Sequence, residues 1–153
     1  MLTIRRYRAA DHDQVWDLHN LALNDVGAHA GSGEWDDDLH RVEEAYLNAG
    51  GEFLVGILDG RIVAMGALKR TSPTRAKVTR MRVHPDCQRR GFGAAILRAL
   101  ESRAAELGCK TLHLETTFQQ TAARGLYARF GYKETGRTVV AGFDVILFEK
   151  SLS

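Results

Sequence analysis

The segment VHPDCQRRGFGAAIL, which begins at Val83, runs from an expected strand through a glycine turn into an expected helix. The N–H groups at the start of a helix are unpaired and carry the positive end of its dipole, so they attract anions. Glycine at 91 and 93 lets a phosphate approach these groups without meeting a side chain. The lysine-bearing pattern of a P-loop is absent, and Ile96 stands where the dinucleotide fingerprint requires Gly or Ala. The turn therefore predicts a phosphate or pyrophosphate held by backbone groups, or else a tight turn that binds nothing.

Lysine and arginine are concentrated between residues 69 and 90, a segment whose one acidic residue is Asp86. Such a local positive charge suits a phosphorylated ligand, but a solvated rim has the same composition, so charge alone leaves both interpretations open. The net charge of the chain is only +2, which is too small to indicate nucleic-acid binding. Nucleic acid is therefore not an expected partner.

Histidine and cysteine are not spaced as metal ligands. The six histidines form no HxH or HExxH pattern, and the two cysteines, Cys87 and Cys109, are far apart in the sequence. We expect no metal ion, and we expect both cysteines to be structural thiols.

Apolar periodicity and turn residues divide the chain into strands and helices. We expect a strand at 2–7, a hairpin of 52–58 and 61–68 that turns at Asp59-Gly60, and strands at 77–83 and 111–117. A final hairpin over 132–150 turns at Ala141-Gly142. Helices are expected to begin near residues 11, 36, 91 and 122, and the second of them to end at Gly50-Gly51. This order predicts a mixed sheet with helices on its faces, an α/β or α+β domain.

The expected strand at 77–83 changes phase along its length. Its apolar residues fall on an even position at Val78 but on odd positions at Met81 and Val83. Because alternation in a strand has a period of two, the change predicts a bulged residue between Val78 and Met81.

Two segments resemble signatures of the GNAT superfamily of acyl-CoA-dependent N-acetyltransferases. The residues QRRGFG at 88–93 are similar to its Q/R-x-x-G-x-G/A motif, and the preceding Val-His-Pro is also usual there. LETTFQQTAARGLYARFGYKE, from Leu114, looks like the second signature, a strand followed by a helix that ends in LY…GY. The order of elements agrees over essentially the whole chain. The resemblance implies a mixed, mostly antiparallel central sheet that is splayed at a bulged strand and flanked by about four helices.

The resemblance also implies where acetyl-CoA, the acyl donor, would bind. Main-chain N–H groups of the glycine turn would hold its pyrophosphate, and the strand before the turn would pair with the pantetheine arm through Met81, Arg82 and Val83. Gln120 replaces the asparagine of many relatives, and its amide offers the same contact on a longer stem. The residues of the turn are Gln88, Arg89, Arg90, Gly91, Phe92, Gly93 and Ala94.

Two residues are candidates for proton transfer. Tyr127 matches a tyrosine that in many relatives protonates the departing thiolate, although it also fits an apolar helix face as a core residue. Many relatives have a glutamate base at the position of Lys77, which cannot act as a carboxylate. Glu115 is the remaining candidate for the general base. The alternatives are that Glu115 is a rim carboxylate paired with an arginine, or that a chain of waters takes the proton.

The identity of the acceptor should depend on the region between the first two helices, which lines the acceptor pocket in relatives. Here that region carries Glu34 and Trp35 beside Asp36. An aromatic face with carboxylates suits a cationic amine, whereas a helix cap with a packed tryptophan is the alternative.

We therefore expect an enzyme that moves the acetyl group of acetyl-CoA by direct attack to a primary amine, either a small polar amine or a peptide or protein amine. A catalytically silent acyl-CoA-binding module and an acyltransferase for longer acyl groups are the competing interpretations. The chain has 153 residues, 44% of them hydrophobic, which predicts one domain over residues 1–153. It has no apolar run long enough to span a membrane and no secretory signal, so we expect a cytoplasmic protein without a membrane partner. A homodimer is left open.

Overall fold

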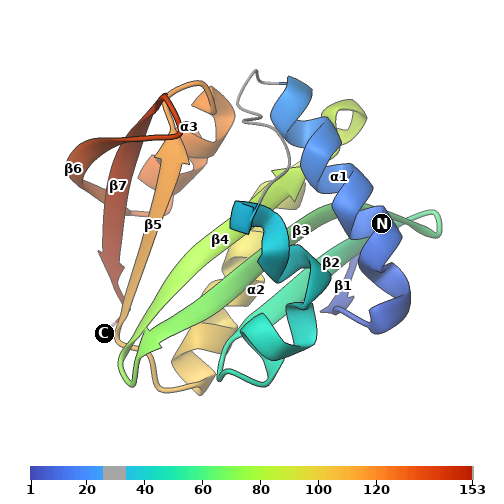
Figure 1. Cartoon of the computed structure of the whole chain (residues 1–153), viewed down its shortest axis with the longest axis horizontal. Coiled ribbons are helices and arrows are strands. Elements are labelled where there is room, and N and C mark those ends of the chain that lie inside the picture. Colours follow the sequence, from blue (N-terminus) through green and yellow to red (C-terminus); the bar gives the residue numbers. More distant parts are fainter. Residues whose placement is uncertain (26–33, 153) are drawn as a thin grey trace.

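The computed structural model describes residues 1–25 and 34–152 (Figure 1). Seven strands form one sheet in the order β1-β2-β3-β4-β5-β7-β6. Neighbouring strands are antiparallel except β4 and β5, which are parallel. The strands are β1 Thr3–Arg6, β2 Glu52–Leu58, β3 Arg61–Ser72, β4 Arg75–Val83, β5 Thr111–Thr117, β6 Lys133–Val140 and β7 Phe143–Ser151.

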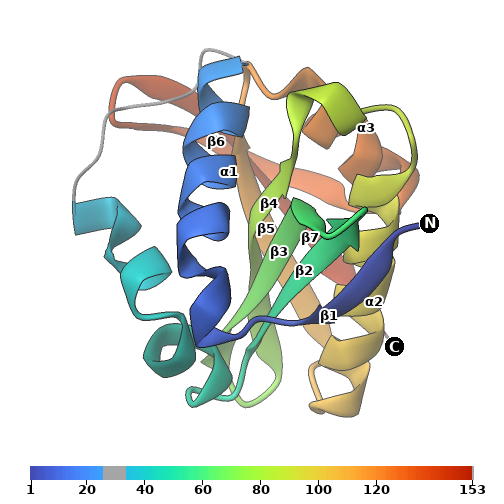
Figure 2. The same ribbon diagram turned by 90° about the vertical axis from the view of Figure 1, so that its right-hand side faces the viewer.

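Helices cover both faces of the sheet. They are α1 His12–Asp25, α2 Phe92–Glu106 and α3 Thr121–Arg129, the 3-10 helices η1 Ala9–Asp11, η2 Glu34–His40 and η4 Pro85–Cys87, and the π-helix η3 Glu43–Leu47. Figure 2 shows α1, η2 and η3 on one face of the sheet, with α2 and α3 on the other. None of the helices in the described residues has the length and apolar character that crossing a membrane requires.

Each face of the sheet has its own core. Leu100 of α2 packs with Leu112 of β5 in one cluster, and Val15 of α1 packs with Phe53 of β2 in the other. Residues 62–68 of β3 are all buried because this strand lies between the two clusters. The apolar stripe of each helix and the unbroken apolar run of β3 are the sequence patterns that this layering requires.

Both predicted hairpin turns are confirmed. Asp59 and Gly60 join β2 to β3 with φ of 51° and 80°, and Ala141 and Gly142 join β6 to β7 with φ of 50° and 81°. Two successive residues with positive φ form the turn whose twist matches that of the flanking strands.

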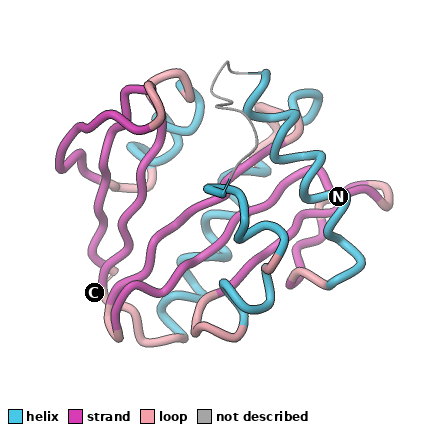
Figure 3. The backbone as a smooth tube through the Cα atoms, in the orientation of Figure 1, coloured by secondary structure: helices cyan, strands magenta, loops and turns pink. Residues whose placement is uncertain are grey.

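The parallel strands β4 and β5 are paired along only part of their length. Four residue pairs join them, from Arg75 with Thr111 to Val78 with Leu114. Figure 3 shows the two strands diverging from that end. We call the diverging segments, residues 79–83 of β4 and 115–117 of β5, the fork.

The predicted bulge in β4 lies at the base of the fork. Ala67 of β3 faces Thr79 and Met65 faces Arg82, so a step of two residues on β3 matches a step of three on β4. Arg80 takes up the extra residue with a left-handed φ of 58°. The bulge turns β4 away from β5 and directs the Arg80 side chain toward η2, where it pairs with Asp38.

Gly66 of β3 lies beside this bulge. A Cβ added there would lie 2.6 Å from Met81 Sδ and 2.7 Å from Ile96 Cγ2. The helix α2 can approach the sheet this closely only because residue 66 has no side chain.

The second expected helix, which the sequence places between residues 36 and 49, is wrong as a single α-helix. The structure has the 3-10 helix η2 followed by the π-helix η3. Asp36 and Asp38 both reach Arg80, at 3.4 and 2.6 Å. In an α-helix residues i and i+2 point about 160° apart, but in a 3-10 helix they are about 120° apart. The tighter winding therefore lets both carboxylates face one guanidinium.

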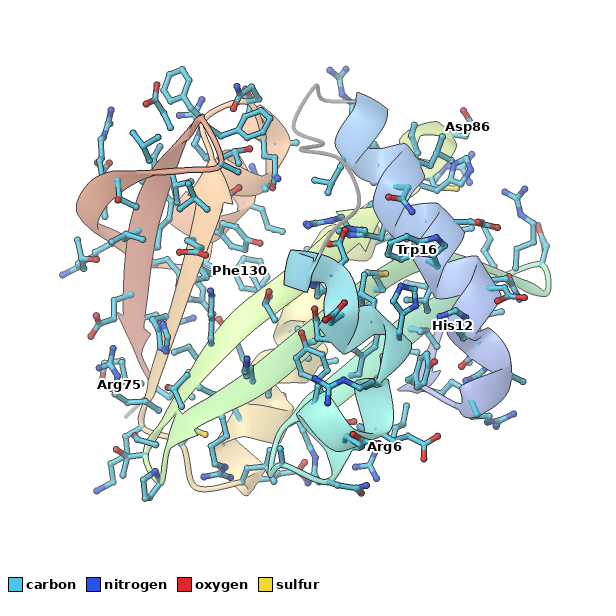
Figure 4. The ribbon with its side chains drawn as sticks, viewed as in Figure 1. Arg6, His12, Trp16, Arg75, Asp86 and Phe130 are labelled. Atoms are coloured by element: carbon cyan, nitrogen blue, oxygen red, sulfur yellow. The ribbon has the colours of Figure 1, made fainter. Side chains whose placement is uncertain are left out.

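Contacts between aromatic rings, and a hydrogen bond between two histidines, hold η2 against α1. Trp16 of α1 lies with its ring centroid 4.6 Å from that of His40, and His12 Nε2 is 2.8 Å from His40 Nδ1. Figure 4 shows Trp16 and His12 on α1. These contacts hold the segment that carries the Asp36 and Asp38 side chains beside the sheet.

Candidate active site

Two adjoining hollows open at the fork. The large hollow, of about 700 Å³, lies between η2, the fork and the β6–β7 hairpin. The small hollow, of about 320 Å³, lies between the end of β4, the start of α2 and α3. The residues that line both hollows are Leu23, Met81, Arg82, Gln120 and Tyr127. Small molecules bound in the two hollows would therefore meet at these five side chains.

The glycine turn forms one wall of the small hollow. Gly91 is the N-cap of α2, has φ of 80°, and caps the helix without a side-chain hydrogen bond. The first backbone bond of the helix runs from the Ala95 N–H to the Gly91 carbonyl, at 3.0 Å. The N–H groups of residues 92–94 therefore have no acceptor within the helix, which is the arrangement that binds an anion.

Side chains around the turn favour the same ligand. Arg89 and Arg90 are exposed, and neither forms an ion pair within the described residues. A Cβ at Gly93 would lie 3.4 Å from Leu126 Cδ2, inside the small hollow that both residues line. Among the predicted turn residues, Arg90 and Ala94 are the two that do not line this hollow. Gly91 needs its left-handed backbone, and Gly93 keeps the floor of the hollow open.

Tyr127 of α3 lies where the two hollows meet. Its ring packs edge-on against Tyr132 at 5.8 Å and the residue is 4% exposed, so it is a core residue as well. Its hydroxyl has no hydrogen-bond partner within the described residues. Burial raises the pKa of Tyr127 to about 12, against the opposing charge of Arg82. The phenol is therefore protonated at neutral pH and can donate a proton.

Gln120 is the N-cap of α3 and also lines both hollows. The Thr116 hydroxyl donates to its Oε1 at 2.8 Å. This bond fixes the side-chain carbonyl, which leaves the amide NH₂ group as the donor that Gln120 can offer to a ligand.

Glu115 of β5 lines the large hollow only. It accepts a hydrogen bond from Lys77 Nζ at 2.9 Å, and the two side chains are 40% and 29% exposed. The structure thus brings together the candidate base and the lysine that replaces the base of relatives. This is the ion-paired rim carboxylate of the alternative interpretation, with a lysine as its partner.

Charged and polar side chains form a cluster at the large hollow, and their contacts with one another were not predicted from the sequence. Arg80 Nη2 and Nε donate to Asp38 at 2.6 and 3.0 Å, and the Tyr46 hydroxyl donates to the same carboxylate. His19 of α1 contacts Asp36 Oδ1 through Nε2 at 3.1 Å, and Arg82 Nε lies 3.4 Å from His19 Nδ1. The cluster joins α1, η2, η3 and β4 around the base of the fork. The bulge was the one sequence signal that pointed to this place.

Burial and pairing compete within this cluster. Burial alone would raise the pKa of Asp38, but the hydrogen bonds and charge of Arg80 outweigh it and hold that pKa below its ordinary value. Arg82 has no such carboxylate, so burial, with the like charge of Arg80 adding to it, lowers the pKa of its guanidinium to about 10. Both guanidinium groups stay charged at neutral pH.

The predicted acceptor residues Glu34 and Trp35 are the first two residues of η2. The structure describes their backbone but not their side chains. Cys87 is a buried free thiol that lines the small hollow, and Cys109 is a buried free thiol in the α2 core. Within the described residues no three His, Cys, Asp or Glu side chains are placed to share a metal ion.

The sequence and the fold are similar to those of known proteins. The model of the acetyltransferase (GNAT) family matches residues 13–132. An acetyltransferase from Yersinia pestis (strain Pestoides F) is 30% identical over 115 residues, which cover 74% of this chain and 79% of that protein. An acetyltransferase of the GNAT family from Staphylococcus aureus Mu50 has a TM-score of 0.92 at 18% identity, covering 100% of both chains. The Salmonella typhimurium protein yncA, solved with its cofactor acetyl-CoA, has a TM-score of 0.83 at 21% identity, covering 100% of this chain and 95% of that one.

The family match includes α1, the fork, the glycine turn and Tyr127, all of which contribute to the two hollows, but not the β6–β7 hairpin that lines the large hollow. The Yersinia relative extends the likeness over most of both sequences. The chain therefore belongs to the acetyltransferase (GNAT) family and is an acyl-CoA-dependent N-acetyltransferase.

Proposed function

We propose that this enzyme transfers the acetyl group directly to a primary amine in the large hollow while acetyl-CoA occupies the small hollow. The observation that carries the proposal is the meeting of the two hollows at Met81, Arg82, Gln120 and Tyr127. A donor and an acceptor bound side by side at these residues can react without a covalent enzyme intermediate.

The small hollow suits both the pyrophosphate and the extended arm of the donor. The unpaired N–H groups of residues 92–94, with Arg89 and Arg90 beside them, suit a pyrophosphate. In the fork, residues 81–83 have no strand partner on the β5 side, because β4 and β5 pair only as far as Val78. Main-chain groups on that side are available to an extended arm, as at any open strand edge.

Bound acetyl-CoA supplies the thioester carbonyl that a neutral amine attacks. The C–N bond forms as the C–S bond breaks, and the departing sulfur takes a proton. Tyr127 holds a proton at Oη, and burial keeps it there at neutral pH. The amine must lose a proton in turn, which goes to Glu115 once that carboxylate is released from Lys77, or to water. The acceptor is a small polar amine or a peptide or protein amine, with Glu34 and Trp35 as the proposed contacts for its cationic form.

Thermal melting with acetyl-CoA, coenzyme A and ATP in parallel tests the donor site. A ligand at 100 times its dissociation constant stabilises the folded state by about 2.7 kcal/mol, which raises the melting temperature by about 5–11 °C. We expect both coenzyme A forms to stabilise the chain more than ATP, and Gly91→Asp to remove the effect. Gly60→Asp is the matched control, because Gly60 also has a left-handed φ but lies in the β2–β3 turn outside both hollows.

Thiol release in the presence of a panel of primary amines then tests transfer. An amine that accelerates release, with formation of the N-acetyl product, supports the proposal. A chain that binds acetyl-CoA but acetylates no amine contradicts it and would be the catalytically silent module.

A further inference from the structure

Arg82 is a cation in the fork that forms no ion pair with a carboxylate among the described side chains. Its Nη1 donates to the Met81 carbonyl at 2.8 Å, and its Nε lies 3.4 Å from His19 Nδ1. Arg80, two residues earlier on the same strand, pairs with both Asp38 and Asp36.

Both partners of Arg82 are neutral acceptors. His19 Nε2 lies 3.1 Å from Asp36 Oδ1, so this nitrogen carries the ring proton and Nδ1 presents its lone pair to Arg82. The charge of Asp36 therefore reaches Arg82 only from the far side of the imidazole ring. Met81 contributes a backbone carbonyl. These two contacts orient the Arg82 side chain, but among the side chains that the structure describes they provide no direct counter-ion for its charge.

The free part of this guanidinium lies where the substrates meet. Arg82 lines both hollows, as does Tyr127, and its Nη2 has no acceptor within the described residues. Burial and the like charge of Arg80 lower the pKa of this guanidinium to about 10, and the charge of Asp36 offsets them only in part. A planar guanidinium with free N–H groups is the protein's preferred partner for a planar carboxylate.

We propose that Arg82 binds a carboxylate carried by the acceptor, so that the substrate is an amino acid or a similar small amine with a carboxylate a few bonds from its nitrogen. The inference rests on the proposed function and chooses between the two acceptor classes left open there. A peptide or protein amine presents a neutral amide at that distance from its nitrogen, so it would provide no counter-ion for the charge of Arg82.

Matched pairs of acceptors test this without any substitution. Each of a set of common L-amino acids is compared with its own carboxamide, with acetyl-CoA saturating and thiol release as the readout. Loss of one charged hydrogen-bond pair corresponds to about 10- to 100-fold. We expect the wild-type chain to prefer the acids over the amides by that factor in kcat/KM, through KM. Equal use of acids and amides, or a preference for amides, overturns the proposal while leaving amine acetylation intact.

Variants assign the preference to Arg82. Arg82→Gln should lose the preference by raising KM for the acids and not for the amides, and Arg82→Lys should keep part of it. Lys110→Gln removes the same charge from an exposed residue outside both hollows and should keep all of it. If Arg82→Gln lowers kcat equally for acids and amides, Arg82 serves the reacting carbonyl and the proposal is wrong.

A binding measurement separates this inference from the proposed function. With coenzyme A present, N-acetyl amino acids should raise the melting temperature of the wild-type chain more than their N-acetyl carboxamides do. That difference should disappear in Arg82→Gln, whose response to acetyl-CoA alone shows that it is folded. If the difference is absent in the wild-type chain, the inference fails. If no amine is acetylated although acetyl-CoA binds, the proposed function fails.

Discussion

The Tyr127 side chain packs in the core with Tyr132 and Phe148, and the same residue lines both hollows. Packing fixes the ring, and the desolvated site keeps the hydroxyl protonated. A proton donor needs both properties, because its position and its protonation state must be set before the substrate arrives. The core interpretation and the catalytic interpretation of Tyr127 therefore support each other.

Tyr127→Phe keeps the ring and removes only the hydroxyl, so we expect normal melting and a kcat about 100-fold lower or more. Because the pKa of Tyr127 is about 12, the wild-type kcat should show no descending limb between about pH 6 and 9 from loss of this proton. The measurement is thiol release against pH for both proteins. A descending limb in the wild type that disappears in the variant would show that the phenol titrates in this range and contradict the assignment.

Arg80 is the residue on which the polar cluster depends most for stability. Its side chain is 13% exposed and that of Asp38 is 19% exposed. Arg80→Met leaves a largely buried carboxylate without its partner, which should lower the free energy of unfolding by about 3–5 kcal/mol at neutral pH, as measured by urea denaturation. Arg41→Met removes an ion pair with Glu44 that is 60% and 71% exposed, and should cost less than about 1 kcal/mol.

The pH dependence of that penalty has a definite sign. The folded pKa of Asp38 lies below its ordinary value of 3.8, so its pairing contributes stability above that pH and loses it as the pH falls through the folded pKa. The difference between wild type and Arg80→Met should therefore be largest at neutral pH and shrink below about pH 4. A difference that does not change with pH would mean that packing, and not charge, determines the penalty.

Single residues were predictable from the sequence where a local motif marks them. The glycine turn and Tyr127 belong to contiguous signatures, and Tyr127 and most residues of the turn line the hollows. The Arg80–Asp38 pair joins residues 42 positions apart, so no local pattern indicates it. The roles assigned to the turn, to residues 81–83 and to Tyr127 stay predictions, as do those of Glu115, Gln120, Glu34 and Trp35.

Among the elements, β4 does the most to shape the site, because its bulge separates the fork from the pairing with β5. Gly66 permits this geometry, since a Cβ there would meet Met81 and Ile96 at 2.6 and 2.7 Å. Gly66→Ala should cost about 1–3 kcal/mol of stability by overpacking, measured by thermal or urea denaturation, and should reduce acetyl-CoA binding by displacing Met81.

Gly136→Ala is the control for this substitution in another strand. A Cβ there would lie 3.6 Å from Leu147 Cδ1, an ordinary contact, so we expect little change in stability. Equal effects of the two substitutions would mean that the close approach of α2 to β3 is not what limits residue 66.

Strands and hairpins were predictable because their signals are local. Apolar runs and paired turn residues marked β2, β3 and both hairpins, and the phase change marked the bulge. The segment of η2 and η3 was not predictable in the same way. Its three consecutive aspartates are typical of a helix N-terminus. In the structure they lie in a 3-10 helix, because Asp36 and Asp38 both pair with the guanidinium of Arg80, which lies on a strand distant in the sequence.

For the molecule as a whole, the sheet is continuous but its two halves are joined by four residue pairs of β4 and β5. Coenzyme A should bridge the halves beyond those pairs. We expect it to slow hydrogen exchange in peptides that cover residues 79–95, which include the N–H groups of residues 92–94 and the open edge of β4, and to leave β2 unchanged. Mass spectrometry with and without coenzyme A is the measurement. Uniform slowing along the chain would indicate only global stabilisation and would contradict donor contact at the fork.

The elements that line only one of the two hollows also bear on how such a chain can diversify over generations. Residues of η2 and η3 line only the large hollow, and the glycine turn lines only the small one. If each hollow takes the substrate proposed for it, substitutions in η2 and η3 could change the molecule that is modified while the glycine turn continues to bind the donor.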